Sequence, residues 1–481
     1  MTISANKTIV FLAAMLLFVG CFAAAYADEP ALLFAPLALL ISICLFQYPQ
    51  LLFYTLIASI PWSTEFHFSE SLGTDLPDEP LMLLTAFAAL ALWLNRKKMK
   101  EPKRFHPLLF LLFISFCWWA IAVVASTYPL FSVKYLAAKT WYLLAFVALP
   151  LLLKTDEKLL KNSAVVLFVS TFAATVLVLY RHTGLGFTFA RINDAVHPFF
   201  RNHVNYSALL ALITPLQVAF IRQTKNKDLR HPLIASLIVV IAALYFSYSR
   251  GAWLAFFVGL SGFWLIKKGW LFKTFLAFLL LVTISVAWLR YNDNYLRFAP
   301  DHNTTIFHQN FSEHLAATYQ GKDVSTAERF YRWAAGTNMS REKLFTGFGP
   351  TTFYSNYKSY TVPLFRTWVS DNKEHSTVHN YFLLVLIEQG VPGLLLLLFL
   401  FGTMFYYAQK IYRSTKDEFW KTVVAAIGSI LLMQCTLNFL SDLIETDKVG
   451  SVFYLCVAVL VMADRSMKSE VRVRKTENEE G

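Results

Sequence analysis

The sequence predicts an all-α polytopic membrane protein with about 12–14 transmembrane helices and one large extramembrane loop. The composition is the first reason: 56% of the 481 residues are hydrophobic and only 15% are charged. A soluble globule of this length needs far more charged surface. The second reason is the recurrence of long apolar runs, and the third is the position of the basic residues between them.

Apolar runs that are long enough, or nearly long enough, to cross a bilayer recur along the chain. They lie at about 8–27, 31–46, 48–61, 80–95, 107–126, 132–153, 163–180, 204–221, 232–248, 252–266, 270–289, 392–409, 421–440 and 449–464. The first run resembles a signal peptide, and we expect it to be retained as a span. Because the run at 48–61 is short, the expected number of spans is a range.

Basic residues gather in every second connection, which predicts the orientation. These basic runs lie at 96–104, 154–161, 222–230, 267–273, 410–421 and 465–475. With a cytoplasmic N-terminus all of them face the cytoplasm of a bacterial inner membrane, so the formal charge of +12 reflects topology and predicts no nucleic-acid partner. We divide the chain into N-terminal spans (1–289), a periplasmic loop (290–391), C-terminal spans (392–464) and a cytoplasmic tail (465–481).

The stretch 379–393 connects this loop to the membrane. It begins with the polar pair His379 and Asn380, continues as an apolar helical segment, and breaks at Gly390 and Pro392. A titratable imidazole is therefore expected at the water-facing rim of the bilayer. The alternative for His379 is a buried histidine that bonds a carbonyl group.

One helix is expected inside the loop. Ser325-Thr326-Ala327-Glu328 has the pattern of a capping box and predicts a helix from Thr326 to about Ser340. Arg329 and Trp333 would share one face of this helix, with Arg332 also nearby. A solvated helix face is the alternative explanation for these arginines.

Arg250 lies in the tight turn Ser249-Arg250-Gly251-Ala252 between two apolar runs at the outer boundary. An arginine at this depth is unfavourable unless an anion or a carboxylate meets it. Gly251 would allow a bulky group to approach the backbone closely. Snorkelling of Arg250 to lipid phosphate is the alternative.

The outer loop at 181–203 adds further polar candidates at the same membrane face. We name Arg191, Arg201, Asn202 and His203 as substrate-binding candidates, together with Asn380 and Arg332. Their other possible role is to order the loop.

The residue types at this face match the chemistry of a lipid-linked sugar donor. Guanidinium groups stay charged and match the oxygens of a pyrophosphate. A neutral imidazole can remove a proton from a sugar hydroxyl. A polyprenyl pyrophosphate would keep its tail in the lipid and present its diphosphate at this depth.

Together these motifs resemble the O-antigen ligase and O-antigen polymerase superfamily. The resemblance covers roughly residues 200–440, and it rests on His379-Asn380 before Gly390 and Gly393, and on the Ser249-Arg250-Gly251-Ala252 turn. Asn202-x-x-Asn205 with Pro215 in the following helix, and Arg329 before Trp333, fit the same pattern.

The resemblance implies a glycosyltransferase C-like fold and an inverting transfer that uses no metal or other cofactor. It implies that Arg250 and Arg329 bind the pyrophosphate of an undecaprenyl-pyrophosphate-linked glycan and that His379 acts on the acceptor. An alternative is that Asp75, Asp78 and Glu79, on an outer loop, bind a divalent cation. The need for a soluble surface loop explains these three acidic residues equally well.

Three functions remain open. The first is a ligase that moves a glycan onto lipid A-core, and the second is a polymerase or a protein O-oligosaccharyltransferase with the same chemistry. The third is a transporter, which would place charged residues near the middle of its spans, whereas the charges here cluster at the ends.

Overall fold

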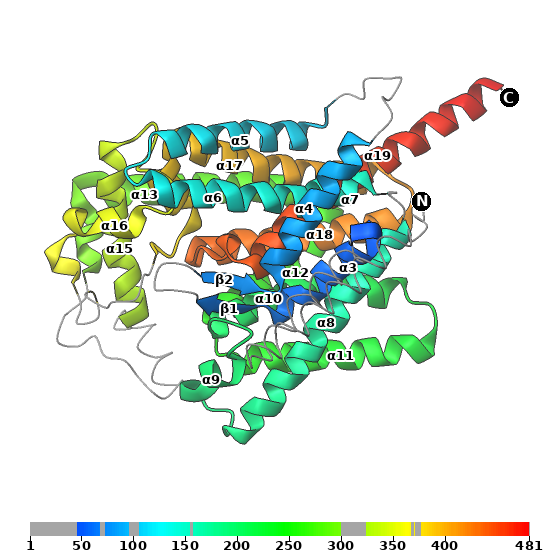
Figure 1. Ribbon diagram of the computed structural model, residues 1–481, viewed down its shortest axis with the longest axis horizontal. Helices are drawn as coiled ribbons and strands as arrows, with labels where there is room; N and C mark the ends of the chain where they lie inside the picture. Colours follow the sequence, from blue (N-terminus) through cyan, green and yellow to red (C-terminus); the bar gives the residue numbers. More distant parts are fainter. Residues whose placement is uncertain are drawn as a thin grey trace, which may run out of the picture.

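The computed structural model describes residues 46–67, 73–95, 105–153, 157–299, 324–366, 370 and 377–480. The described chain is an all-α bundle, which confirms the predicted fold class (Figure 1). Nine of its described helical segments are long and apolar enough to cross a membrane. These are Pro107–Val124, Pro129–Leu152, Glu157–Gly184, His203–Gln223, Lys227–Phe246, Leu271–Phe298, Tyr381–Ser414, Glu418–Leu440 and Asp447–Glu470.

Each predicted span in the described part of the chain lies on a helix. The long helices are α5 (Pro107–Val124), α6 (Pro129–Tyr142), α8 (Glu157–Gly184), α10 (His203–Gln223), α11 (Lys227–Phe246), α12 (Arg250–Lys268), α13 (Leu271–Arg290), α17 (Tyr381–Ser414), α18 (Glu418–Leu440) and α19 (Asp447–Glu480). The predicted runs at 48–61 and 80–95 fall on α3 (Pro49–Ser59) and α4 (Asp78–Leu94), which are shorter. The predicted runs at 8–27 and 31–46 lie outside the described residues, except for residue 46.

Shorter elements complete the fold. Between α6 and α8 lie the π-helical turn η3 (Leu143–Ala148) and α7 (Leu149–Leu152). The hairpin β1 (Thr64–His67) and β2 (Gly73–Leu76) is antiparallel, with Thr64 opposite Leu76 and Glu65 opposite Asp75. The remaining short elements are η2 (Ile60–Trp62), η4 (Phe189–Arg191), α9 (Ile192–Val196), η5 (Tyr291–Phe298), α15 (Val324–Glu342), α16 (Phe353–Asn356), η6 (Tyr357–Tyr360), η7 (Pro363–Phe365) and η8 (Leu443–Glu445).

Close packing of α12 against α18 forms the centre of the bundle. The two helices are antiparallel, since Gly262 faces Ser429 and Gly259 faces Met433. A Cβ at Gly262 would lie 2.7 Å from the Cα of Ser429, so glycine is required for this approach. As a consequence, the C-terminal end of α18 lies beside the N-terminal end of α12, where Arg250 begins the helix.

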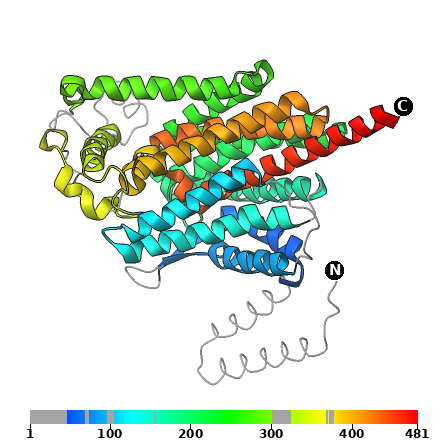
Figure 2. The ribbon, with the colours of Figure 1, turned by 90° about the horizontal axis from the view of Figure 1, so that it is seen from above.

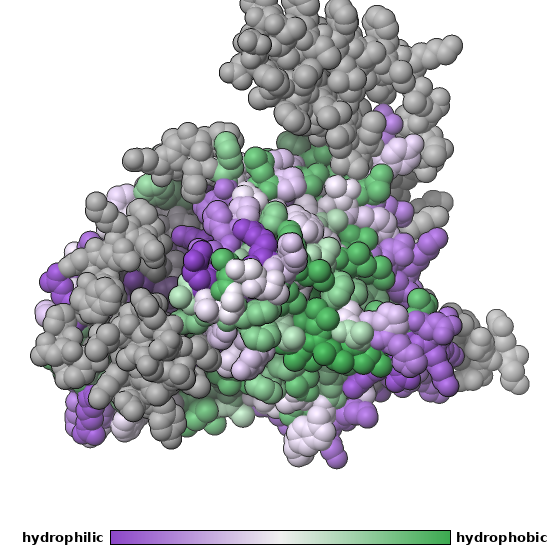
Figure 3. All heavy atoms as spheres, turned by 90° about the horizontal axis from the view of Figure 1, so that it is seen from below, coloured by the Kyte–Doolittle hydropathy of each residue, from purple (hydrophilic) through white to green (hydrophobic). Residues whose placement is uncertain are grey.

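Apolar side chains on the outer helices form a band between two polar ends (Figure 3). Only 11% of the apolar window of the segment that contains α13 is buried inside the protein, against 78% of that of α18. Leu280 and Leu281 on α13 are each 62% exposed. Side chains of this kind are stable when lipid covers them, so the band marks the membrane-facing surface.

The two ends of the bundle differ. The helices α15 and α16 of the large loop gather at one end, and the C-terminus of α19 extends from the other (Figures 1 and 2). We call the first the loop end. The predicted helix from Thr326 to about Ser340 is confirmed as α15, which lies at the loop end beside the start of α17. Because α15 already includes Val324 and Ser325, Ser325 is not its N-cap, as the predicted capping box required.

Candidate functional site

The break within α17 is held in place by the loop at 343–350. Gly390 has a φ of +69°, and a Cβ there would lie 2.0 Å from the carbonyl oxygen of Phe345. The N–H of Val391 donates to the Leu344 carbonyl at 2.8 Å. Glycine alone tolerates both this φ and this approach, so the predicted break at Gly390 is confirmed.

His379 occupies a sharp turn just before α17. Asn380 is the N-cap of the helix, and its Oδ1 accepts the N–H of Leu383 at 3.0 Å. His379 itself has a φ of +53°, in the left-handed region that few side chains adopt. The N–H of Tyr381 donates to the carbonyl of Ser441 at 3.0 Å, which ties this turn to the end of α18. His379 therefore precedes the short helix on which we expected it, and strain of this kind is common at functional sites.

Two arginines of α15 act on the imidazole of His379. Burial of the ring, together with the positive charges of Arg332 and Arg329, lowers the pKa of His379 to about 3. The ring is therefore neutral at physiological pH and can accept a proton. An anion bound beside the arginines would offset their charge and raise the pKa of His379 again.

Arg332 is held by one partner on α15 and another just before His379. The guanidinium is buried, pairs with the carboxylate of Glu328 at 3.3 Å, and donates to the carbonyl of Thr377 at 3.3 Å. Glu328 also accepts the hydroxyl of Ser370 at 2.7 Å. Trp333 on the next position donates its indole N–H to the Val378 carbonyl at 3.0 Å. These bonds hold the backbone just before His379 against α15.

Arg250 is the first residue of α12, directly after the short connection at 247–249. The N-terminus of a helix favours a negative group, because its free N–H groups carry partial positive charge. A guanidinium at this position strengthens the local positive potential. The side chain of Ser249, the N-cap, makes no capping bond. An ideal Cβ on Gly251 lies 3.4 Å from Leu440, so this turn adjoins the last residue of α18.

The α18 end connects the Arg250 turn to the His379 turn. Phe439 lies edge-on to Trp333, with ring centroids 6.0 Å apart. Leu440 adjoins Gly251, and Ser441 bonds to Tyr381. The structure thus brings the Arg250 turn, α15 and the His379 turn to the same end of α18.

Arg201 interacts with the carboxylate of Asp442, close to the His379 turn. Its positive charge acts on Asp442, whose side chain also bonds to Thr377. Burial raises the pKa of Asp442, and the bond to Thr377 and the charge of Arg201 oppose that rise. Arg201 is therefore linked to the residue two positions before His379.

The other predicted binding residues have local partners. Arg191 pairs with Asp194 on the exposed surface, and Nδ1 of His203 contacts the Asn193 side chain at 2.9 Å. Asn202 is the N-cap of α10, and its Oδ1 accepts the N–H groups of the next turn. For these three residues the structure supports the alternative role, ordering of the outer loop.

A buried ion pair beneath the site was missed. Lys139 on α6 is 3% exposed and pairs with Glu445 at 2.8 Å. Glu445 also accepts the hydroxyl of Tyr381, the first residue of α17. Our expectation that charges stand only at the ends of the spans is therefore wrong for Lys139. The apolar run 132–153 contains two lysines, Lys134 and Lys139, and a lysine this far inside a run is the signal that could have identified it.

A second missed carboxylate supports the loop. Glu388 on α17 accepts the backbone N–H groups of Thr351 at 2.9 Å and Phe353 at 3.0 Å. It lies one residue before Gln389, whose carbonyl accepts the indole N–H of Trp118 at 2.9 Å. Glu388 therefore caps a turn of the loop and is no candidate for the chemistry.

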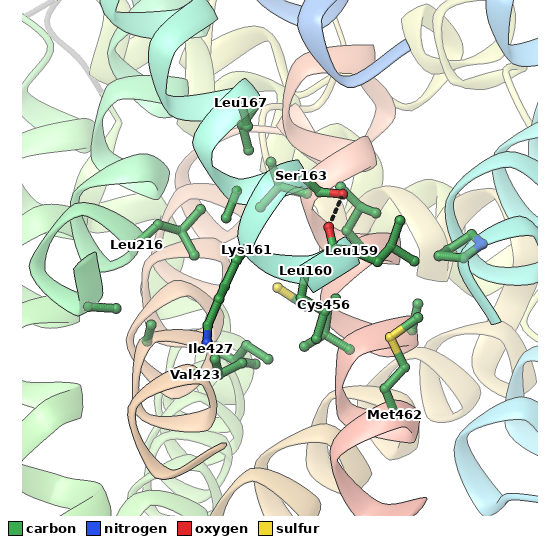
Figure 4. Close-up of a pocket in the computed structure, with 18 of the residues that line it drawn as sticks. Leu159, Leu160, Lys161, Ser163, Leu167, Leu216, Val423, Ile427, Cys456 and Met462 are labelled. Carbon is green, nitrogen blue, oxygen red and sulfur yellow. Dashed lines mark hydrogen bonds between the residues drawn. The ribbon is translucent and has the colours of Figure 1, made fainter. Parts of the chain in front are cut away.

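The most prominent cavity lies away from this site. It has about 1010 Å³ of empty space, including space open to the outside, between α3, α8, α10, α18 and α19. Its walls are mostly apolar, with Leu159, Leu216 and Ile427 among them, and Lys161 at one side (Figure 4). These residues come from the helix halves remote from the loop end. The lining cation, Lys161, already pairs with Glu157 at 2.9 Å, so we place the candidate site around His379.

The site combines a neutral imidazole with guanidinium groups from distant parts of the chain. A family comparison matches residues 235–398 to the model described as O-antigen ligase. A search among curated proteins found none that matches. The matched segment contains Arg250, Arg329 and His379. The match confirms the resemblance noted from these residues: the segment at 235–398 is similar to the O-antigen ligase family.

Proposed function

We propose that this protein is an O-antigen ligase-like inverting glycosyltransferase. Its donor is a glycan on undecaprenyl pyrophosphate, its acceptor is a hydroxyl group of lipid A-core, and the loop end faces the periplasm of a bacterial inner membrane. The observation that carries this proposal is the position of His379 beside Arg332 and Arg329, where the imidazole is neutral. The similarity of residues 235–398 to the O-antigen ligase family supports the same class of chemistry.

Arg250 and Arg329 are the proposed ligands of the diphosphate. Both are basic groups at the loop end, and Arg250 adds its charge to that of the α12 N-terminus. Arg332 is already paired with Glu328, so it positions the Thr377–His379 backbone and adds to the positive field. The undecaprenyl tail would lie along the apolar band of the membrane-facing surface.

The proposed step is a direct displacement at the anomeric carbon. The acceptor oxygen forms a bond to this carbon while the bond from the carbon to the pyrophosphate oxygen breaks, so the configuration inverts. His379 takes the proton of the acceptor hydroxyl. Arg250 and Arg329 stabilise the charge that grows on the leaving diphosphate. The bound diphosphate also offsets the arginine charge beside His379, which raises the basicity of the imidazole when the donor is present.

The proposed ligase differs from a polymerase and from a protein O-oligosaccharyltransferase in its acceptor. A polymerase uses the terminal sugar of a second lipid-linked glycan, and a protein O-oligosaccharyltransferase uses a serine or threonine hydroxyl. Neither needs different groups at His379 or at the arginines. A transporter would need charged groups that change partners during the cycle, and the buried pair of Lys139 and Glu445 instead anchors the start of α17.

Deletion of the gene, followed by analysis of surface and lipid-linked glycans, tests the proposal. A ligase predicts loss of glycan-capped lipopolysaccharide and accumulation of full-length lipid-linked polymer. Accumulation of single repeats would indicate a polymerase, and loss of glycoprotein alone would indicate the protein-glycosylating branch. Unchanged glycans of all three kinds would contradict the proposal. Complementation with His379→Ala and with the control His203→Ala, at equal membrane levels, then tests the imidazole.

A further inference from the structure

Two neighbouring aspartates at the hairpin meet a third aspartate from a distant part of the chain. Asp75 is on β2, Asp78 begins α4, and Asp447 begins α19. Each offers one carboxylate oxygen, and these oxygens lie within 4.8 Å of one another. Glu79, which the sequence grouped with Asp75 and Asp78, instead accepts the hydroxyl of Thr74.

Asp78 has an unused oxygen in this cluster. The side chain is fully buried, with 0% exposure. Its Oδ1 accepts the hydroxyl of Ser63 at 2.6 Å and the N–H of Glu79 at 3.0 Å. Within the described residues, its Oδ2 has no hydrogen-bond partner. Burial of a carboxylate oxygen without a hydrogen-bond partner costs free energy, and a bound cation would remove that cost.

The local charges leave the cluster negative. Lys448 is the nearby cation and acts on all three carboxylates, but its Nζ donates to the carbonyl of Ser63 at 3.1 Å. The hydroxyl of Tyr142 donates to Asp447 without adding charge. With the three carboxylates ionised, as cation binding requires, the negative charge of the aspartates exceeds the single positive charge of Lys448, and a divalent cation would offset the excess.

We propose that Asp75, Asp78 and Asp447 bind a divalent cation of the hard, oxygen-seeking class, such as Mg²⁺ or Ca²⁺. The cation fastens the β1–β2 hairpin to the start of α19. It also holds the connection at 441–446, whose Ser441 carbonyl bonds to the N–H of Tyr381. The site is distinct from the groups assigned to the transfer, so it stands whether or not the proposed function is correct.

Binding of Mn²⁺ to the full-length protein, purified in detergent and treated with chelator, tests this proposal. Electron paramagnetic resonance measures free Mn²⁺ directly. We expect one saturable site per chain, from which Mg²⁺ or Ca²⁺ displaces Mn²⁺. Asp75→Asn and Asp447→Asn should each lower the affinity roughly tenfold or more. The control Asp228→Asn removes the same charge from the exposed start of α11 and should leave the affinity unchanged.

Two results would overturn the site: wild-type protein without a saturable site, or Asp75→Asn and Asp447→Asn proteins that bind Mn²⁺ as the wild type does. Thermal unfolding in the presence of chelator checks that each variant is folded. Asp75 is partly buried, and Asp75→Asn decides the test if Asp447→Asn prevents folding. Because the measurement involves no glycan, its outcome does not depend on transfer activity.

Discussion

Two polar loops at the loop end use their side chains differently. In the outer loop at 185–203, Arg191 pairs with Asp194 three residues away, and His203 contacts Asn193 ten residues away. In the large loop, Arg332 and Trp333 bond to carbonyls 45 residues along the chain, next to His379. The outer loop is therefore held by contacts between residues close in sequence, whereas contacts in the large loop join residues 45 positions apart. A polar residue is a stronger candidate for chemistry when its neighbours come from several elements.

Paired histidine substitutions test this comparison with the largest expected effect. His379→Gln removes the proposed base, and we expect glycan transfer in isolated membranes to fall by about 10²–10⁴-fold. His203→Gln keeps a polar side chain of similar size and should leave the rate within about twofold, because the ring of His203 contacts Asn193 of its own loop. Equal losses in the two variants, at equal protein levels, would remove the distinction between the loops.

Paired arginine substitutions sharpen the same comparison. Arg250→Gln and Arg329→Gln each remove a charge that would stabilise the leaving diphosphate, and we expect a loss of about 10²–10³ in transfer rate. Arg191→Gln removes a charge paired on the surface, and should change the rate by no more than a few-fold. A large loss for Arg191→Gln alone would place the donor at the outer loop instead.

Two glycines test whether the break in α17 is required. In Gly390→Ala the new Cβ meets the Phe345 carbonyl at 2.0 Å in a backbone with positive φ, so we expect a loss of about 2 kcal/mol or more. Gly184→Ala is the control, because a Cβ there meets nothing within 4 Å and should change stability by no more than about 0.5 kcal/mol. Thermal unfolding in detergent measures both, and equal melting temperatures would contradict the described break.

The pH dependence of stability tests the charge around His379 and should be the smallest effect. The pKa of His379 is lowered from 6.5 to about 3 in the folded protein. Between these values the unfolded chain binds the additional proton, so stability falls as the pH drops below 6.5. His379→Gln lacks this contribution, and its melting temperature should fall less between pH 7 and pH 5 than that of the wild type. Parallel curves would show that burial and the arginine charges do not lower the pKa of His379.

Much of the fold could be predicted from the sequence because membrane spans are read directly from hydropathy. The break at Gly390 and the presence of helix α15 were also predictable, since each depends on a local signal. The sequence could not decide the role of His203, because its contact with Asn193 exists only in the folded loop and no sequence motif indicates it.

Contacts between distant segments could not be predicted. Lys139 on α6 and Glu445 beside α19 are 306 residues apart, and only the packed bundle places them together. The same holds for Asp447, which joins Asp75 and Asp78 in place of the adjacent Glu79. One sequence shows which residues are unusual at a membrane face, but the pairing of those residues depends on the tertiary fold.

The central claim is that guanidinium groups far apart in the sequence bind one lipid-borne diphosphate. The most direct test is the equilibrium affinity of the purified protein for a polyprenyl diphosphate, measured for the wild type, Arg250→Gln and Arg329→Gln. We predict that each substitution weakens binding by about tenfold or more and that added salt reduces the difference. Wild-type affinity in both variants, with the proteins folded, would contradict the claim.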